Sequence, residues 1–562
     1  MNKPTYLFEI LWSLGIAVLC VCASQSQSNS RQKSSRPTVR VSLFHLLPFA
    51  LWLLTRATPW TNVLDVGLLR LWGIKSSSYP YDSWAAVTTF PSVVTEYLLR
   101  NNFAPDVIAA LFSLLGFYCW YFAYLILLRL WLHGHVLQVL TASTFSLLNL
   151  LTIAASPIFG FVAPWVGSST FGMLGAAMLA LSLALQITGQ FSCAVMIHLL
   201  LMAVSPVNAL LSLAGLVFSA IHSLWIKQPN VFALIGIFGS GILTFIMQNS
   251  NSSYAQSPSP ESYSSYLELW DLHRNTNHYK LSVSSILVVA LAVLLCVYVI
   301  RTAKVRKSGY SVDTPALTAI VAVLSSLLVL DALQRLSLAV GLVQSASSFP
   351  AIGLMPLRLT ESAGFLSLAL GLLSASEWKA RTRRFKLSYQ ILSHVLPLAL
   401  MISAFVYWNF DMNQSWLNYY LNNRSQNFAK PQNPFDSANV EKRVSLAAPG
   451  LSESALWEFG LRVPIHDRVV ESVAYQPEML KRTIDFIVLG YGLDFFHPKP
   501  PPRCGCIPQR PEIRNLWERR TKSEWLRVSK DLRIEYVLVP SDWKIKLNQI
   551  EARDDQVLYR IP

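Results

Sequence analysis

Long apolar runs alternate with short polar segments along most of the chain. A membrane-spanning helix needs about 20 mostly apolar residues. Such runs lie near 4–23, 41–57, 107–131, 136–155, 168–187, 190–204, 206–225, 229–248, 280–300, 314–335, 358–376 and 390–409. The pattern predicts an α-helical polytopic membrane protein with about eleven or twelve transmembrane helices. Residues 1–40 form an N-terminal helix, either a signal anchor or a cleaved signal sequence, and a basic cytoplasmic linker.

Basic residues between the runs predict the orientation of the helices. Cytoplasmic loops of membrane proteins carry an excess of Lys and Arg. Basic residues gather at 31–40, at Lys227, at 301–307 and at 379–386. The number of runs between these positions allows all four on the cytoplasmic side. Loops 58–106 and 249–279 and the chain after residue 410 then lie outside.

The pattern changes near residue 410, where the chain becomes polar. Residues 41–409 are therefore expected to form the transmembrane domain and residues 410–562 a small extracytoplasmic α/β domain. Short runs rich in β-branched residues predict strands at 468–473, 483–489, 534–539 and 556–561. Residues 452–461 and 514–531 are expected to be helical.

Composition supports a membrane protein. The chain is 53% hydrophobic and 14% charged, whereas soluble domains carry about 25% charged residues. The net charge is +15, but the basic clusters are short and lack interleaved aromatics, which excludes a nucleic-acid surface. Cys504 and Cys506 form a Cys-Gly-Cys in a Pro-rich loop, which is compatible with a strained disulfide or with two free thiols. No second Cys pair or His pair accompanies them to complete a zinc site.

Two outer loops contain the candidate chemistry. Asp82 lies between Tyr81 and Trp84 in loop 58–106, where it either caps a helix or serves function. Loop 249–279 ends in a segment with His273, Arg274 and His278 close to a span. Polar groups are costly near a bilayer and are often functional there. Arg and His donate well to phosphate, although such a segment also suits an interfacial anchor.

Two features inside the apolar runs have less specific meanings. Arg358 begins the span at 358, where it pairs with Glu361 on one helix face or lines a polar cavity. Ser205-Pro206 separates two apolar runs and predicts a broken or re-entrant helix pair. His198 in the first of these runs is interpreted as a hydrogen-bonded packing residue.

The layout resembles the GT-C class of membrane glycosyltransferases, which use polyprenyl-phosphate-linked sugars. More narrowly, it is similar to bacterial polytopic proteins with an outer loop reading Arg-x-Pro-His-His-Tyr. The matching stretch runs from Arg274 to Tyr279, with Thr276 and Asn277 in place of Pro and the first His. Segments 356–360 and 524–561 are also similar to that group. The resemblance covers residues 41–562 in layout, through short motifs.

The resemblance implies sugar transfer from a polyprenyl-phosphate donor on the outer face of the bacterial inner membrane. Asp82, or Asp65 as second choice, would activate the hydroxyl of a glycan, lipid or protein acceptor. The leaving phosphate would be neutralised by groups in the second outer loop and at a later span: Arg274, His278, His273, Tyr279 and Arg358. No cofactor is required, and a divalent metal is optional.

Two other functions remain open. A flippase or exporter of lipid-linked sugars would place charged residues along a path through the spans. This chain keeps most of its charges at the span ends. A non-catalytic GT-C-like scaffold in a cell-envelope polysaccharide system would agree with the incomplete Arg-x-Pro-His-His-Tyr match.

Overall fold

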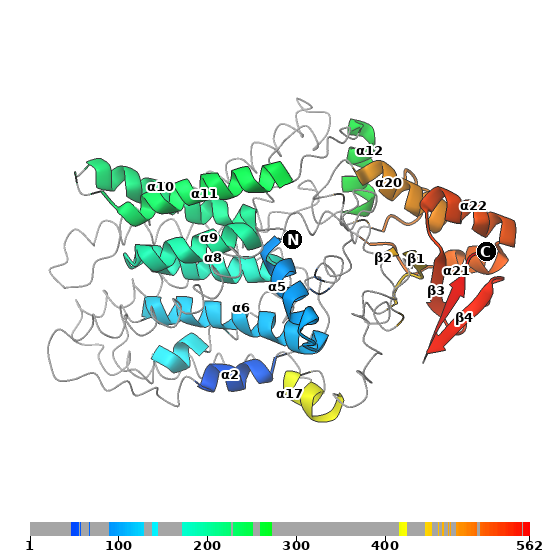
Figure 1. Cartoon of the computed structure of the whole chain (residues 1–562), viewed down its shortest axis with the longest axis horizontal. Coiled ribbons are helices and arrows are strands. Elements are labelled where there is room, and N and C mark those ends of the chain that lie inside the picture. Colours follow the sequence, from blue (N-terminus) through cyan, green and yellow to red (C-terminus); the bar gives the residue numbers. More distant parts are fainter. Residues whose placement is uncertain are drawn as a thin grey trace.

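Long apolar helices and a small C-terminal sheet make up the parts of the chain that the computed structural model describes. These are residues 46–55, 57, 64, 67, 89–128, 138–143, 146, 171–225, 227, 229–250, 259–271, 415–423, 444–451, 459, 463–465, 470, 473, 479–502, 506–553 and 555–562. The structure is mostly helical. Figure 1 shows a layer of roughly parallel and antiparallel helices beside a separate α/β unit.

The predicted spans at 4–23, 280–300, 314–335, 358–376 and 390–409 lie outside the described residues, and the run at 136–155 is described only at 138–143 and 146. The other apolar runs, between residues 41 and 250, contain helices as expected. Their bounds are α2 Leu46–Leu53, α6 Pro105–Leu128, α8 Phe171–Ile187, α9 Phe191–Val204, α10 Pro206–Trp225 and α11 Val231–Ser250, and α5 Thr89–Arg100 lies in the predicted outer loop. Among the described residues, two helices, Pro105–Ile126 and Asn208–Trp225, are by length and composition able to cross a membrane. Three further apolar helices are shorter: Leu174–Ile187, Phe191–Val204 and Val231–Thr244.

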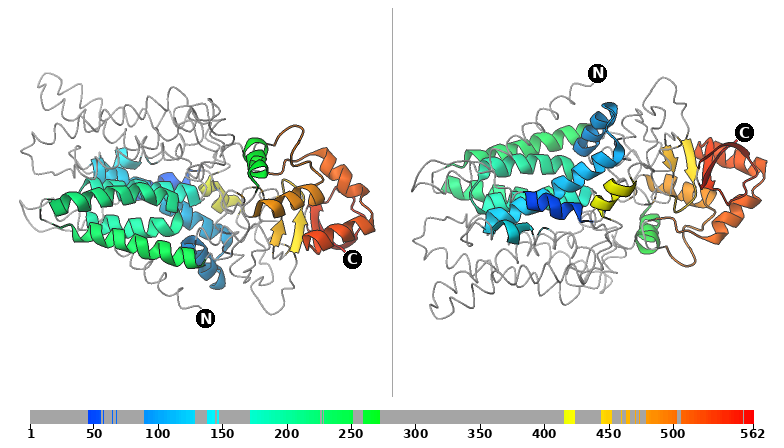
Figure 2. Two further views of the ribbon diagram at one scale, coloured as in Figure 1. Left: turned by 90° about the horizontal axis from the view of Figure 1, so that it is seen from above. Right: turned by 90° about the horizontal axis from the view of Figure 1, so that it is seen from below.

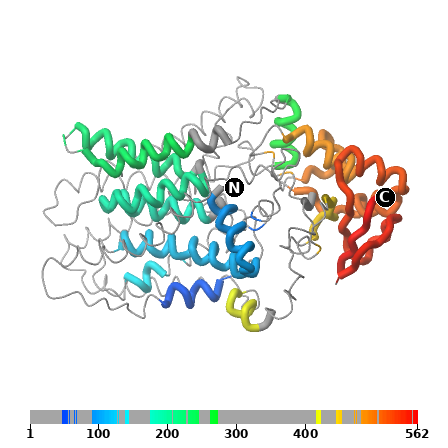
Figure 3. The backbone as a smooth tube through the Cα atoms, in the orientation of Figure 1, coloured from blue at the N-terminus to red at the C-terminus, as the bar shows by residue number. Residues whose placement is uncertain are grey.

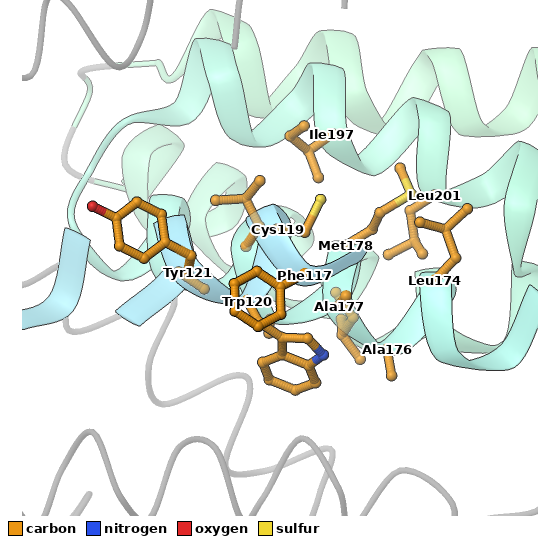
Figure 4. Packing of buried hydrophobic residues seen from close by; sticks show 14 of the residues in the cluster. Phe117, Cys119, Trp120, Tyr121, Leu174, Ala176, Ala177, Met178, Ile197 and Leu201 are labelled. Atoms are coloured by element: carbon orange, nitrogen blue, oxygen red, sulfur yellow. The ribbon is translucent and has the colours of Figure 1, made fainter. Parts of the chain in front are cut away.

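Helices α6, α8 and α9 form the centre of the helical layer. Their facing side chains are almost fully buried, including Phe117, Leu179 and Leu201. Figure 4 shows aromatic rings of α6 and small side chains of α8, such as Ala176 and Ala177, in this interface. Small side chains allow helix backbones to approach closely, as in membrane helix bundles.

Helices α9 and α10 form a tight hairpin at Ser205. Helix α9 ends at Val204 and Ser205 caps it, with the Ser205 amide donating to Leu201 O at 2.7 Å. Pro206 then begins α10, which suits proline because the first helical residue needs no amide donor. Gly175 of α8 lies against this hairpin, since a Cβ atom on it would come within 2.5 Å of Ser205 Cβ. Ser205-Pro206 therefore breaks the apolar run into two helices, as predicted.

The C-terminal unit is a five-stranded mixed sheet with helices against it. The strand order is β2-β1-β3-β5-β4. Strand β1 is parallel to β2 and β3, whereas β5 is antiparallel to β3 and β4. The strands are β1 Val444–Ala447, β2 Val463–Ile465, β3 Tyr536–Pro540, β4 Asn548–Arg553 and β5 Gln556–Arg560. Strands β3 and β5 confirm the predicted strands at 534–539 and 556–561.

Helices of the C-terminal unit bury aromatic side chains against the sheet. They are α20 Leu480–Asp485 with the π-helical turn η14 Phe486–Gly490, α21 Pro511–Arg519 and α22 Lys522–Leu532. Trp517 and Trp525 are fully buried and pack edge to face, with ring centroids 5.6 Å apart. Val537 and Val539 of β3 belong to the same core. The predicted helix 514–531 is therefore two helices, with a break at Arg520 and Thr521.

Two predicted strands were wrong where the structure describes them. Residues 483–489 form part of α20 and η14 instead of a strand. The buried residues here include Leu480, Thr483, Ile487 and Gly490, and this spacing of three or four residues is typical of one helical face. In the predicted strand 468–473, the described positions Val470 and Val473 are in 3₁₀ conformation.

Candidate functional site

None of the residues predicted to form the transferase site falls within the described part of the chain. This applies to Asp82, Asp65, Arg274, His278, His273, Tyr279 and Arg358. The structure does describe chain segments immediately next to two groups of them.

The chain beside Asp65 packs closely on helix α5. Leu64 is fully buried in the core of the helical layer. Gly67 approaches Thr95 so closely that a Cβ atom on Gly67 would lie 2.2 Å from Thr95 Cγ2. Glycine is therefore required at position 67 for this contact. Leu64 and Gly67 therefore lie against the helical layer on either side of Asp65 in the sequence.

The chain before His273 and Arg274 packs into the C-terminal unit. It forms helix α12, Pro260–Ser265, and the π-helical turn η3, Tyr266–Trp270. Ser259 caps α12 by accepting from the amide of Ser262 at 3.3 Å. Tyr266, Leu267 and Trp270 are almost fully buried in the same core as Trp517 and Trp525. Figures 1 and 2 show α12 beside α20, although the two are far apart in sequence.

Trp270 and Asp271 fix this docked segment. Trp270 Nε1 donates to Phe495 O at 2.8 Å, and the two rings stack with centroids 5.6 Å apart. Tyr266 OH donates to Asp271 Oδ2 through a short hydrogen bond. Asp271 is fully buried. The predicted phosphate-binding stretch therefore begins directly after a rigidly packed residue.

A buried carboxylate at the start of α6 is the site feature that sequence reasoning missed. Asp106 follows Pro105 in the first turn of α6 and has only 2% of its surface exposed. A carboxylate is favourable there because the helix N-terminus has partial positive charge. The pKa of Tyr419 lies above its ordinary value because of burial first and the charge of Asp106 second. The Pro-Asp helix start near the end of loop 58–106 was the available signal.

Aromatic side chains from the segment after the last predicted span pack beside this carboxylate. The segment comprises α17 Trp416–Asn418 and the π-helical turn η11 Tyr419–Asn423. Trp416 is fully buried and stacks on Trp52 of α2, with centroids 5.5 Å apart. The Trp416 amide donates to Thr55 O at 3.0 Å. We call the end of the helical layer defined by Asp106, Trp52 and Trp416 the domain end, since Figure 3 shows the C-terminal unit on this side.

Other buried polar groups hold the helices together. His198 of α9 bonds through Nε2 to Ser240 Oγ of α11 at 2.7 Å. Ser182 of α8 bonds to Ser212 of α10 at 2.7 Å, and Gln186 donates to Ser212 O at 3.0 Å. Such bonds join apolar helices. They confirm the interpretation of His198 as a hydrogen-bonded packing residue.

The described cysteines and metal-ligating residues are the remaining candidates for chemistry. Across the described ranges, no three His, Cys, Asp or Glu residues gather to hold a metal. Cys119 is a buried free thiol. Cys506 and Cys193 are disulfide-bonded, with partners outside the described residues. The bonded state of Cys506 therefore agrees with the disulfide alternative for the Cys-Gly-Cys loop. Cys193 lies in an apolar run, where a small core residue is expected, but it is disulfide-bonded as well.

Comparison of the chain with protein-family models, with curated proteins and with solved structures found no match.

Proposed function

We propose that this protein is a polytopic membrane glycosyltransferase of GT-C type. It transfers a sugar from a polyprenyl-phosphate donor to a glycan, lipid or protein acceptor on the outer face of the membrane. The observation that carries the proposal is the docking of Tyr266–Asp271 into the C-terminal unit. Arg274 follows Asp271 by three residues, which span at most about 11 Å of chain. A phosphate-binding stretch and a separate folded unit are thereby held together.

The outer surface of the α10–α11 hairpin supports membrane insertion. It presents these exposed large apolar side chains: Leu210, Phe218, Ile221, Leu224, Trp225, Val231, Phe232, Ile235, Phe238 and Ile242. Soluble monomers rarely expose large contiguous apolar surface. Acyl chains would cover it, and Trp225 followed by Lys227 in the connecting turn has the composition of a membrane boundary.

The proposed chemistry assigns roles to residues of the two outer loops and of a later predicted span. Asp82, with Asp65 as second choice, accepts the proton of the attacking hydroxyl. Arg274 and His278 donate to the leaving phosphate, together with Arg358, His273 and Tyr279. Asp106 adds a buried carboxyl group at the domain end. The disulfide at Cys506 agrees with an oxidising compartment for the C-terminal unit.

Native mass spectrometry of the purified full chain tests this function. We expect a co-purified polyprenyl phosphate or its sugar conjugate, whose mass identifies the sugar. The lipid should disappear in an Arg274→Ala, Arg358→Ala double variant and remain in Arg100→Ala. Arg100 is a matched control because it is exposed and paired with Glu96 at 2.9 Å. Absence of such a lipid, or its retention in the double variant, would favour the scaffold or a transporter.

A second arm tests the base. Asp82→Asn should abolish sugar transfer while leaving expression and bound lipid intact, because the amide cannot accept the proton. Full activity in this variant would remove Asp82 from the mechanism and leave Asp65 as the candidate.

A further inference from the structure

The loop after η14 is a rigid exposed platform on the C-terminal unit. At its beginning, Tyr491 OH donates to Ala447 O at 3.0 Å. In its middle, buried Phe495 stacks on Trp270 and accepts from the indole nitrogen. At its far end, Arg510 Nη1 donates to Lys499 O at 3.0 Å. The backbone between residues 491 and 499 is therefore held at three points along its length.

Three chemically complementary side chains of this loop point outward. Phe496 is 40% exposed, although an aromatic ring of this size is usually largely buried. The Asp494 and His497 side chains are 57% and 78% exposed, and His497 Nδ1 lies 3.5 Å from Asp494 Oδ2. An apolar ring thus lies within two residues of a hydrogen-bond acceptor and an imidazole.

Backbone hydrogen bonds fix the carboxylate in this arrangement. Asp494 Oδ1 accepts from the amides of Phe496 at 2.9 Å and His497 at 3.1 Å. These bonds, chiefly the one from His497, lower the pKa of Asp494 below its ordinary value. Oδ2 remains on the side of His497. A fixed negative charge of this kind favours ligands that donate hydrogen bonds over ligands that are anionic.

We propose that Asp494, Phe496 and His497 form a binding subsite for a neutral sugar ring. The apolar C–H face of a pyranose packs on the Phe496 ring, whose face carries partial negative charge. Ring hydroxyls donate to Asp494 Oδ2 and exchange hydrogen bonds with the His497 imidazole. This inference rests on the proposed transferase function and gives it a neutral glycan as acceptor. Trp270 supports the subsite through Phe495, next to the phosphate-binding stretch.

Saturation-transfer NMR on the full chain in detergent tests the subsite. The probes are neutral oligosaccharides of glucose, mannose, galactose and N-acetylglucosamine, each measured alone. We expect at least one to bind, with about tenfold weaker affinity in Phe496→Ala and recovery in Phe496→Tyr. Phe103→Ala is the matched control, because Phe103 is similarly exposed at 43% but belongs to the helical part. His497→Gln should weaken the same probe and covers the case in which Phe496→Ala fails to fold.

The outcomes separate this inference from the function on which it rests. Binding of no probe, binding unchanged in both variants, or tighter binding of a sulfated oligosaccharide than of its neutral counterpart would overturn the subsite. None of these results depends on the bound polyprenyl lipid. Loss of the lipid result with intact glycan binding would overturn the transferase and leave the sugar subsite in place.

Discussion

Trp270 and Phe495 are separated by 225 residues of sequence, yet the Trp270 indole donates to the Phe495 carbonyl at 2.8 Å. Their rings also stack with an angle of 8° between the planes. A segment that follows helix α11 thereby becomes part of the core of the C-terminal unit. The unit is a composite of two distant segments of the chain.

Replacing Trp270 with alanine should destabilise the C-terminal unit. The indole is fully buried, and truncation of a buried Trp costs about 3–5 kcal/mol. Hydrogen exchange of the β3 amides in the full chain measures the effect. Trp225→Ala is the control, because Trp225 is 82% exposed. Equal protection of β3 in both variants would mean that the C-terminal unit is stable without the docked segment.

Replacing Gly67 with alanine should disturb the contact between Gly67 and helix α5. The new Cβ atom would come within 2.2 Å of Thr95 Cγ2, and relieving such overlap costs about 1–3 kcal/mol. Thermal unfolding in detergent measures the loss. Gly241→Ala is the matched control, since a Cβ at position 241 meets nothing within 4 Å. If the two variants unfold alike, the chain at Gly67 does not pack on Thr95 as described.

Removing the cap of α22 should shorten this helix. Thr521 accepts from the Glu524 amide at 3.3 Å, and Glu524 in turn accepts from the Thr521 amide at 2.6 Å. Thr521→Ala should lower the free energy of unfolding by about 1 kcal/mol, whereas Thr521→Ser should retain most of the capping stabilisation. Amide exchange in the first turn of α22 measures the difference. Similar exchange in the alanine and serine variants would contradict the capping role.

Acidification should weaken the packing of α21 on the loop before β4. The Lys544 amide, at 3.0 Å, and Arg514 lower the pKa of Glu518 below its ordinary value. A depressed carboxyl pKa stabilises the fold above the unfolded pKa, and this stabilisation is lost as pH falls through the folded pKa. The protection factor of the Lys544 amide, which corrects for the pH dependence of intrinsic exchange, should therefore fall in acid below the ordinary Glu pKa of about 4.3.

Glu518→Gln should remove most of that acid dependence, since the amide oxygen of glutamine accepts the hydrogen bond in acid and at neutral pH alike. Glu535→Gln is the control, because the Glu535 side chain is exposed outside this contact. Acid sensitivity unchanged in Glu518→Gln would assign the effect to another carboxyl group.

Where the structure describes the predicted spans, the sequence located their helices because the signal is local. A run such as Phe191–Val204 is apolar on all sides, so its length alone indicates a buried or lipid-facing helix. The break at Arg520 was also readable, since Thr521 and Glu524 have the spacing of a capping box. The predicted strand at 483–489 was wrong because the prediction followed the β-branched residues there and not the helical spacing of the residues that become buried.

The docked segment and the buried carboxylate depend on contacts that no local pattern contains. Tyr266 and Trp270 fit an interfacial anchor equally well until Phe495 is placed beside them. Asp106 has the sequence of an ordinary helix start until Tyr419 packs near it. The roles of Asp82, Asp65, Arg274, His278 and Arg358 stay predictions, because these residues lie outside the described part of the chain.

The composite core also constrains biogenesis. Bacterial and eukaryotic ribosomes synthesise about 5–20 residues per second, so Phe495 follows Trp270 by roughly 10 to 45 s on that scale. During this interval Tyr266, Leu267 and Trp270 have no core to enter. We therefore expect the nascent protein to expose this apolar turn until the C-terminal unit is synthesised, so that a holding chaperone or the insertion machinery shields the turn in the interval.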